Sequence, residues 1–355
     1  MRTIEVRAEQ SYNVYVGCSY AERLTELAAN RARVAIIHSG SMQDRIPEFN
    51  FGDSELFYFP VPDGEEGKSV STLQKLWSWL GAAGFTRSDL IIGIGGGAVT
   101  DLSGFAAATW LRGIDWVAVP TTVAGAVDAA VGGKTGINSD YGKNLIGAFH
   151  SPRAVLIDYS WFTTLSNRDF AAGLAEVIKC GFIADPRILE LTRAKSLAEV
   201  RKDSDLVDEL VHRSVSVKAS VVSEDFKESF AREALNYGHT FGHAIESLSK
   251  YSLRHGECVA IGMTFIAELS TALGIIDSST LELHYEILGS LGLPTSIPAE
   301  FNYFSWSDFL AIMKLDKKSR GNSLRFVTLD GIGKTQRLET MSEVELIAAY
   351  ERLLP

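Results

Sequence analysis

Leu90-Ile-Ile-Gly-Ile94 is an apolar run that ends abruptly in the glycine turn Gly95-Gly96-Gly97. The next run along the chain, Trp116-Val-Ala-Val119, ends in the same way at Pro120-Thr-Thr122, and the earlier run Val34-Ala-Ile-Ile-His38 stops at Ser39. Residues 71–84, which lie between the earlier run and the glycine turn, carry apolar residues at helical spacing. Short apolar strands joined by helices predict a parallel sheet covered on both faces, which binds ligands beyond the carboxyl ends of its strands.

The second half of the chain has a different pattern. Apolar residues recur at i, i+3 and i+4 in four stretches, which are residues 169–181, 206–224, 236–250 and 257–273. Only residues 324–329 have the character of a strand there. The sequence therefore predicts an α/β N-terminal domain with a Rossmann-like parallel sheet over residues 1–164. A mostly α-helical C-terminal domain is expected over residues 165–355.

Composition narrows the class of protein. The chain has 355 residues, of which 46% are hydrophobic and 22% charged, so it can bury a large core. Its net charge of −10 argues against a nucleic-acid or membrane partner, because both require clustered Lys and Arg. No run of about 18 apolar residues occurs, and the first residues alternate as a strand does rather than as a secretory leader. Three widely spaced cysteines fit a reducing compartment, so a cytoplasmic enzyme is expected.

The glycine turn is a candidate phosphate-binding loop. It leaves a strand and enters a helix whose N-terminus offers N–H donors, and its glycines permit positive φ and close backbone approach. Residues Gly93 to Ala98 formally match G-x-G-x-x-A. The match is a weak dinucleotide fingerprint, because it is not at the first strand and no acidic residue ends the next one. A tight strand-to-helix turn without a ligand is the alternative.

A second glycine-rich stretch, residues 120–147, is too polar for a core element and too long for an idle connection. It carries Lys134 and Lys143 among many backbone donors, which suits phosphates or carboxylates. The Gly-Gly-Lys-Thr segment is not a Walker loop, because the upstream glycine is absent at the required spacing. Solvated lysines on a loop are the alternative interpretation.

Three histidines form a candidate metal site. His239 and His243 are spaced i, i+4 and so share one helix face, and His255 follows sixteen residues after His239. Thr240 breaks the HExxH pattern of zinc proteases. Spacing favours His239 and His243 as ligands but does not choose between His243 and His255. Glu176 lies in an apolar helical segment, where its charge needs a partner, either a metal or Lys179 one turn later.

Cations also gather near these histidines in sequence. Lys218, Arg232 and Asn236 precede them, and Arg232 and Asn236 are one turn apart if the helix begins that early. Lys314, Lys317 and Lys318 form a further basic cluster, which is either a binding group or a solvated helix face. In an acidic protein, cations around a possible metal and dinucleotide indicate a polyanionic small substrate.

Taken together, these segments resemble the 3-dehydroquinate synthase family of sugar-phosphate cyclases. The resemblance covers most of the chain in order, from the block around Glu65 and Lys68 to the block around Lys318. The matching blocks are residues 62–69, 95–105, 110–113, 119–122, 127–138, 142–149, 173–179, 235–243, 254–257 and 316–318.

The resemblance implies a dehydroquinate synthase-like fold and a specific reaction. Members convert 3-deoxy-D-arabino-heptulosonate 7-phosphate to 3-dehydroquinate and phosphate, in the shikimate route to aromatic compounds. The sequence of steps is transient oxidation by NAD, phosphate elimination, re-reduction, and intramolecular aldol closure. The implied cofactors are NAD, held by the N-terminal domain, and a divalent metal (zinc or cobalt), held with the substrate by the helical domain. A homodimer is also implied.

The resemblance also assigns residues. The implied metal ligands are Glu176, His239 and His255. Residues expected to act on or bind the substrate are Arg112, Asp128, Lys134, Asn144, Lys179, Lys218, Arg232, Asn236, His243 and Lys318, with Arg112 reaching phosphate from a second subunit. Residues expected to contact NAD are Ser39, Glu65, Lys68, Gly96, Gly97, Ala98, Asp101, Thr121, Thr122, Asp128, Lys134, Lys143, Asn144, Thr164 and Leu165.

One departure from the family pattern concerns the ribose. Where members often have an acidic residue after the strand, this chain reads His38-Ser39-Gly40, so Ser39 could make only a weaker contact. Three other functions are weighed against the synthase. They are a related cyclase acting on sedoheptulose 7-phosphate or glucose 6-phosphate, an NAD-dependent polyol dehydrogenase, and an inactive metal- or nucleotide-binding module.

Overall fold

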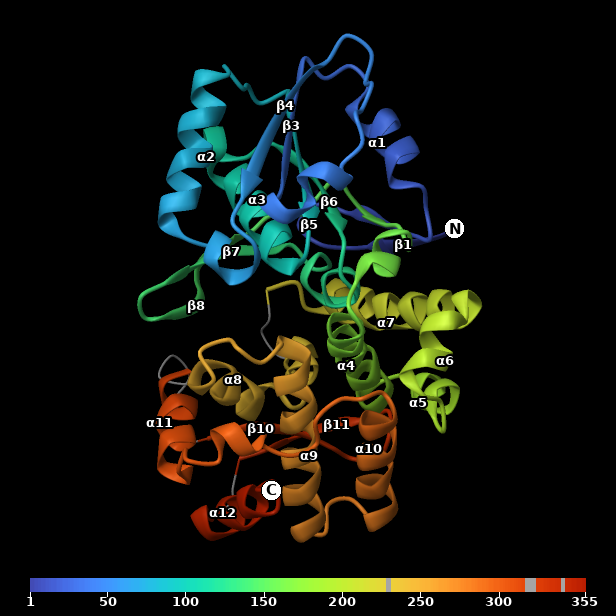
Figure 1. Cartoon of the computed structure of the whole chain (residues 1–355), viewed down its shortest axis with the longest axis vertical. Helices are drawn as coiled ribbons and strands as arrows, with labels where there is room; N and C mark the ends of the chain where they lie inside the picture. The colour runs from blue at the N-terminus through green and yellow to red at the C-terminus, as the bar shows by residue number, and fades with distance from the viewer. Residues whose placement is uncertain (228–230, 317–323, 340–341) are drawn as a thin grey trace. The chain divides into compact units, whose positions relative to one another are not determined.

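The computed structural model describes residues 1–227, 231–316, 324–339 and 342–355 of the chain (Figure 1). The chain divides into two compact units. Unit 1 comprises Met1–Leu165 and Lys218–Lys227, and unit 2 comprises Ser166–Val217 and Glu228–Pro355. The segment Lys218–Lys227 follows the predicted boundary at residue 164 and nevertheless packs with unit 1.

Unit 1 is built on a seven-stranded sheet in the order β1-β2-β9-β6-β5-β3-β4. Every neighbouring pair is parallel except β1 and β2, which form an antiparallel hairpin at one edge. The strands are β1 (Arg2–Val6), β2 (Tyr12–Val16), β3 (Arg33–Ser39), β4 (Glu55–Val61), β5 (Leu90–Gly95), β6 (Asp115–Pro120) and β9 (Ala154–Ile157). The predicted parallel sheet is confirmed, with the antiparallel edge strand as an addition.

The central strands are buried along nearly their whole length, as a sheet covered on both faces requires. All residues of β5 and β9 are buried, and so are all but the first residue of β3 and β6. The helices of this unit are α1 (Tyr20–Ala28), α2 (Val70–Ala82) and α3 (Gly97–Thr109), and its helical turns are η1 (Gly40–Arg45), η2 (Gly64–Gly67), η3 (Trp110–Arg112), η4 (Gly125–Ala129) and η5 (Trp161–Thr164). Apolar β-branched runs therefore form the strands, and α3 is buried from Val99 to Ala107 except at the half-buried Asp101.

The glycine-rich stretch 120–147 is more structured than its composition indicates. It contains the π-helical turn η4 and an antiparallel hairpin of β7 (Lys134–Ser139) and β8 (Gly142–Phe149). The hairpin was not predicted from the sequence. Glycines obscure the strand pattern because Gly136 and Gly147 face each other, where a Cβ on either would lie within 2.7 Å of backbone oxygen.

Unit 2 is mostly helical, as predicted (Figure 1). Its helices are α4 (Asn167–Ile183), α5 (Pro186–Thr192), α6 (Leu197–Lys202), α7 (Ser204–Glu224, whose last turns belong to unit 1), α8 (His239–Leu248), α9 (His255–Ala272), α10 (Ser278–Ser290), α11 (Trp306–Asp316) and α12 (Glu343–Glu351). Shorter elements are the turns η6 (Ala231–Asn236) and η7 (Ala299–Phe301) and the strands β10 (Phe326–Leu329) and β11 (Thr335–Leu338). Strand β11 was not expected, because its residues alternate weakly and carry charge.

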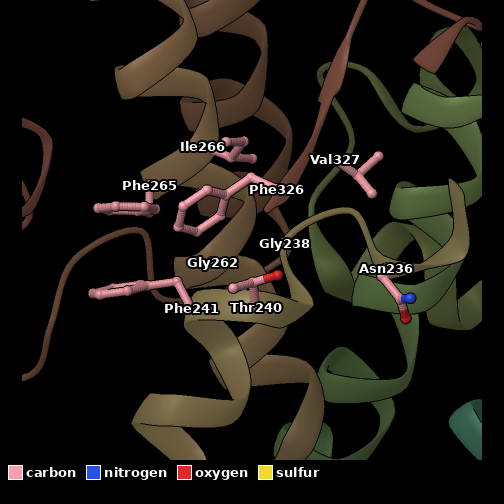
Figure 2. Close-up of a pocket in the computed structure, with 9 residues that line it drawn as sticks. All are labelled: Asn236, Gly238, Thr240, Phe241, Gly262, Phe265, Ile266, Phe326 and Val327. Atoms are coloured by element: carbon pink, nitrogen blue, oxygen red, sulfur yellow. The ribbon is translucent and has the colours of Figure 1, made fainter. Parts of the chain in front are cut away.

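Helix α9 is the core of unit 2. It is buried from Gly256 to Ser270 and packs against α4, α8, α10, α12 and β10. Glycines let the helices approach closely, since a Cβ at Gly262 would lie 1.9 Å from the Gly238 oxygen and a Cβ at Gly256 would lie 1.7 Å from the Ala172 oxygen. Figure 2 shows the aromatic core beside this crossing, where the rings of Phe241 and Phe265 stack at 4.2 Å. A small pocket beside these rings has no titratable side chain in its lining. Its other lining side chains are Asn236, Thr240, Ile266, Phe326 and Val327.

Helix α8 begins later than the periodicity predicts. Gly238 has φ of 77° and separates the turn η6 from α8, so the helix begins at His239 rather than at residue 236. Arg232 and Asn236 therefore lie on a short 3₁₀ turn, and the helix does not begin early enough to place them one α-helical turn apart. Among the described residues, no helix combines the length and the apolarity needed to cross a bilayer.

Candidate active site

The carboxyl ends of the parallel strands gather several of the predicted NAD residues at one edge of the sheet. Strand β4 lies on one side of β3, and the next strand, β5, lies on the other side, so the order in which strands are added across the sheet changes direction between β3 and β5. Parallel sheets bind nucleotides at such a point. Ser39 ends β3, Gly96 to Ala98 follow β5, and Thr121 and Thr122 follow β6. Thr164 and Leu165 come after β9, at the end of the turn η5.

The glycine turn depends on close packing and not on unusual backbone angles. Gly96 caps α3 with φ of −68°, and Gly95 and Gly97 also lack positive φ. A Cβ at Gly95 would lie 2.6 Å from the Val99 side chain, and a Cβ at Gly97 would lie 2.9 Å from Ala129. Of the two properties that glycine permits, positive φ and close backbone approach, this turn uses only the second. The close approach instead leaves the N-terminus of α3 bare of side chains, as an anion site requires.

Lys68 is the centre of a polar network in unit 1. Its ammonium is 2.7 Å from Asp101 Oδ2 on α3 and donates to Asn144 Oδ1 on β8, although the side chain is only 2% exposed. Asn144 reaches this position with φ of 57°, a left-handed conformation that asparagine tolerates. Burial raises the pKa of Asp101, and Lys68 offsets this only in part. Three predicted NAD residues, distant in sequence, are thus in direct contact.

Glu65 extends this network to the β7–β8 hairpin. Lys143 Nζ lies 3.1 Å from Glu65 Oε1, and Asn138 Nδ2 donates to Glu65 Oε2 at 2.7 Å. Burial alone would raise the pKa of Glu65, but Lys68 and Lys143 outweigh it and lower that pKa. Asn138 was not singled out from the sequence, although it ends the matching block 127–138 and also bonds the backbone of Lys68 at 2.8 Å.

The remaining predicted residues of unit 1 lie on other elements. Lys218, on the last turns of α7, donates to the backbone oxygen of Asp128 at 2.6 Å and pairs with its carboxylate. Lys134 is exposed at the start of β7. Arg112 is exposed and has φ of 68° at the end of η3.

Glu176, His239 and His255 form one of two groups of potential metal ligands among the described residues; the other group is His243, Glu246 and His255. Glu176 Oε1 lies 3.5 Å from His239 Nε2 and 3.4 Å from His255 Nε2. One ligand atom from each of the three residues lies within 4.8 Å of the other two. His239 therefore contributes from α8, His255 from α9 and Glu176 from α4, which is one acidic and two imidazole groups facing a common point.

The donor set fits a divalent metal such as zinc or cobalt. Glu176 is 1% exposed, so its carboxylate needs cationic or metal partners. Its Oε2 pairs with Lys179, so the alternative salt bridge does form, while its Oε1 faces the two histidines. His239 Nδ1 is 3.1 Å from the Tyr237 oxygen, to which it can donate, leaving Nε2 with a lone pair toward Glu176.

Ion pairs hold α4 and α9 in register at this cluster. Arg168 on α4 makes two hydrogen bonds to Glu257 on α9, at 2.6 and 2.7 Å. Arg254, which caps α9, donates to Asp169 at 2.7 Å. These contacts flank His255 and fix the start of α9 against α4.

The electrostatics of the cluster are strongly perturbed. Burial would raise the pKa of Glu176, but Lys179, His239 and His255 outweigh it and hold that pKa well below its usual range. Burial and the neighbouring Lys179 lower the pKa of His239 well below its usual range. For His255, burial acts to lower the pKa, but contacts with Glu176 and Glu246 dominate and raise it to about 10.

We expect zinc uptake to release about one proton from His255 at neutral pH, because the metal must displace the proton that a pKa of about 10 retains. The apparent zinc affinity should therefore rise about tenfold per pH unit between pH 7 and pH 9. Calorimetric titrations in two buffers of different ionisation enthalpy count the released protons. Equal heats in both buffers would contradict this assignment.

The other predicted residues of unit 2 differ in burial and in their contacts with the cluster. His243 is exposed one turn after His239 on α8, and its ring centroid lies 5.3 Å from that of His239. Lys179 and Arg232 are buried, and Asn236 is half-buried on η6. Lys318, and Lys317 beside it, lie outside the described residues. Glu246 was missed, although its i, i+7 spacing from His239 places it on the same face of α8.

Family models match most of the chain. The model described as 3-dehydroquinate synthase N-terminal matches residues 58–172, and the model described as 3-dehydroquinate synthase C-terminal matches residues 173–319. A 3-dehydroquinate synthase from Streptomyces avermitilis is 48% identical over 344 residues, 96% of this chain and 94% of the relative. This chain belongs to the 3-dehydroquinate synthase family.

Other members of the 3-dehydroquinate synthase family match over nearly their full length. The enzyme of Mycobacterium leprae is 46% identical over 355 residues, covering 99% of this chain and 97% of the relative. The resemblance inferred from the sequence motifs is confirmed.

Solved structures agree with the fold. A 2-deoxy-scyllo-inosose synthase complexed with carbaglucose-6-phosphate, NAD⁺ and Co²⁺ has a TM-score of 0.88 at 26% identity, covering 99% of this chain and 100% of that one. A 2-epi-5-epi-valiolone synthase from Streptomyces hygroscopicus with NAD⁺ and Zn²⁺ has the same TM-score at 25% identity, covering 99% and 98%. The predicted dehydroquinate synthase-like architecture is thereby confirmed.

Proposed function

We propose that this chain converts 3-deoxy-D-arabino-heptulosonate 7-phosphate to 3-dehydroquinate and phosphate. The observation that carries the proposal is 48% identity to a named 3-dehydroquinate synthase across 96% of the chain. The cyclases that form inosose and valiolone rings are similar at only 26% and 25% identity, so the related substrates are the weaker candidates.

The proposed metal ligands are Glu176, His239 and His255. Their support is the buried carboxylate of Glu176 and the two imidazole nitrogens that lie within 3.5 Å of its Oε1. When bound, the metal supplies Lewis-acid polarisation of a substrate oxygen and NAD supplies reversible hydride acceptance. His243, exposed beside the cluster, would exchange a proton with the substrate hydroxyl.

Charged side chains are proposed to bind the substrate's phosphate and carboxylate and to orient its hydroxyl groups. Burial restricts the side chains of Lys179 and Arg232, and an ion pair restricts those of Lys218 and Asp128. Because these side chains are ordered before substrate arrives, less entropy is lost on binding. The proposed substrate residues are Arg112, Asp128, Lys134, Asn144, Lys179, Lys218, Arg232, Asn236, His243 and Lys318.

NAD is proposed to bind at the carboxyl edge of the unit 1 sheet. The bare N-terminus of α3 at Gly96 and Gly97 would receive its phosphates, and the Lys68 network would hold the hydrogen-bond acceptors beside them. The proposed NAD residues are Ser39, Glu65, Lys68, Gly96, Gly97, Ala98, Asp101, Thr121, Thr122, Asp128, Lys134, Lys143, Asn144, Thr164 and Leu165.

A cytoplasmic homodimer is also proposed. The three cysteines, Cys18, Cys180 and Cys258, are all buried in the fold, which suits a reducing compartment. Exposed Arg112, with its left-handed backbone, would reach the phosphate of a second subunit. Sedimentation of the purified chain at micromolar concentration tests the dimer.

The proposed reaction is tested by measuring phosphate release from the heptulosonate phosphate while the NADH absorbance band is followed. We expect stoichiometric phosphate without net NADH, and loss of release when a chelator removes the metal. Accumulating NADH would indicate a polyol dehydrogenase. Preferential turnover of sedoheptulose 7-phosphate or glucose 6-phosphate would indicate a related cyclase, and no turnover of any of them by zinc-loaded protein would indicate a binding module.

Lys134→Ala should lower kcat/KM by about 10- to 100-fold, because a hydrogen bond between an ammonium and phosphate contributes about 1.5–3 kcal/mol. Steady-state kinetics of phosphate release measure this loss. Lys75→Ala, which removes an exposed lysine from α2 in the same unit, is the matched control and should leave kcat/KM unchanged. Identical kinetics for the two variants would show that Lys134 only faces solvent.

A further inference from the structure

Glu246 is a buried carboxylate on α8 that the proposed ligand set does not use. Its side chain is 6% exposed, and it lies in the last turns of the helix, where the helix dipole disfavours a negative charge. Burial and position both cost free energy, so the carboxylate requires a compensating cationic or N–H partner. His255 supplies such a contact, with Nδ1 3.4 Å from Glu246 Oε2.

The packing of α8 against α9 creates this contact. His239, His243 and Glu246 are spaced i, i+4 and i+7, so they project from one face of α8. A Cβ at Gly242 would lie 2.9 Å from the Cys258 backbone oxygen, so the glycine lets the first turns of α9 approach that face. His255, the first residue of α9, is thereby placed between two carboxylates.

The two ring nitrogens of His255 have different partners. Nδ1 faces Glu246, whereas Nε2 lies 3.4 Å from Glu176 Oε1. If Nδ1–H donates to Glu246, the neutral ring must carry its lone pair on Nε2, which points to the proposed metal position. His239 is oriented in the same way by a neutral group, since its Nδ1 faces the Tyr237 backbone oxygen at 3.1 Å.

We propose that Glu246 is a positioning residue for the metal: its carboxylate accepts a hydrogen bond from His255 Nδ1–H and thereby orients Nε2 as a ligand. A carboxylate acceptor also makes the imidazole a stronger electron donor than the backbone carbonyl behind His239 does. The two imidazole ligands are thus unequal, and His255 is the more strongly bound of the two. This inference rests on the proposed metal site.

The test compares zinc affinities of the full-length chain by competition with a chromophoric chelator. We expect wild type to bind one equivalent of zinc, Glu246→Gln to bind one equivalent about 10- to 100-fold more weakly, and Glu246→Leu to bind more weakly still. This order is expected because the glutamine amide oxygen can still accept a hydrogen bond from His255 Nδ1, although it is neutral, whereas leucine has no acceptor. The visible absorption of the Co²⁺-loaded Glu246→Gln protein should also shift, which a merely structural role would not produce.

Glu268→Gln is the matched control, because Glu268 is another buried glutamate of unit 2. It accepts from Tyr285 at 2.8 Å and pairs with Arg352 at 2.9 Å, away from the histidines. Its zinc affinity should stay within about twofold of wild type, and NAD affinity should be unchanged in all the variants. If Glu246→Gln bound zinc as tightly as wild type, the inference would be overturned. It would also be overturned if wild type bound a second equivalent of zinc that the Glu246 variants did not bind.

A measurement on the unmodified protein covers the case in which the variants do not fold. Nitrogen-15 spectra of the histidine-labelled, zinc-loaded chain report the tautomer of each ring. We expect His255 to carry its proton on Nδ1 and zinc on Nε2, and the opposite tautomer would overturn the inference. If wild type binds no zinc at all, the proposed metal site itself fails, which is a distinct result.

Discussion

His255→Ala should lose its zinc and its synthase activity while NAD still binds. Removing one of three protein ligands should weaken zinc binding by more than about a hundredfold. This loss is larger than the loss expected when only a hydrogen-bond partner of a ligand is removed. Loss of the metal removes several kcal/mol of charge stabilisation, on the order of a thousandfold in rate. Metal analysis after dialysis, NAD titration and the phosphate-release assay measure the three quantities.

His243→Ala is the informative partner of this variant, because sequence spacing favours His243 as a ligand and the structure places His255 against Glu176. We expect the His243 variant to retain zinc and lose activity, since its proposed role is proton exchange. A His243→Ala protein that loses zinc while His255→Ala retains it would reverse the assignment.

Gly256→Ala should destabilise unit 2 by more than about 3 kcal/mol, as severe overpacking does. A Cβ at this position would lie 1.7 Å from the Ala172 oxygen and 2.5 Å from its carbonyl carbon, which are backbone atoms of α4 and cannot rotate away. The start of α9 would have to move from α4, and His255 would move with it. Denaturant unfolding measures the loss, and zinc affinity should fall in parallel.

Gly289→Ala provides the control for this change. Gly289 lies inside α10, and a Cβ added there would have nothing within 4 Å, so alanine should stabilise the helix by about 0.5–1 kcal/mol. The same substitution thus has opposite signs at the two positions. If Gly256→Ala were as stable as wild type, the tight contact between α4 and α9 would not exist in solution.

The elements that could be predicted are those with local signals. Apolar runs that end in glycine or polar residues became β3, β5 and β6, and helical spacing became α2, α4, α7 and α9. The β7–β8 hairpin could not be predicted, because its glycines replace the alternating side chains that mark a strand. The late start of α8 was missed because Gly238 adopts φ of 77°, which periodicity does not reveal.

The candidate site divides in the same way. Glu176, His239, His243 and His255 were recognisable as a group, because few residue types bind metals and their motifs are specific. Asn138 and Glu246 were missed, since each acquires its role from a partner on another element, Glu65 for Asn138 and His255 for Glu246.

The order of residues alone was enough to assign the family, the two-part architecture and the kinds of chemistry available, because motifs and periodicity are properties of short segments. Which imidazole nitrogens face Glu176 depended on the folded chain. Residues on α4, α8 and α9 meet only because Gly242, Gly256 and Gly262 let those helices pack closely. Distances between segments far apart in sequence are set by such packing, and no local pattern records them.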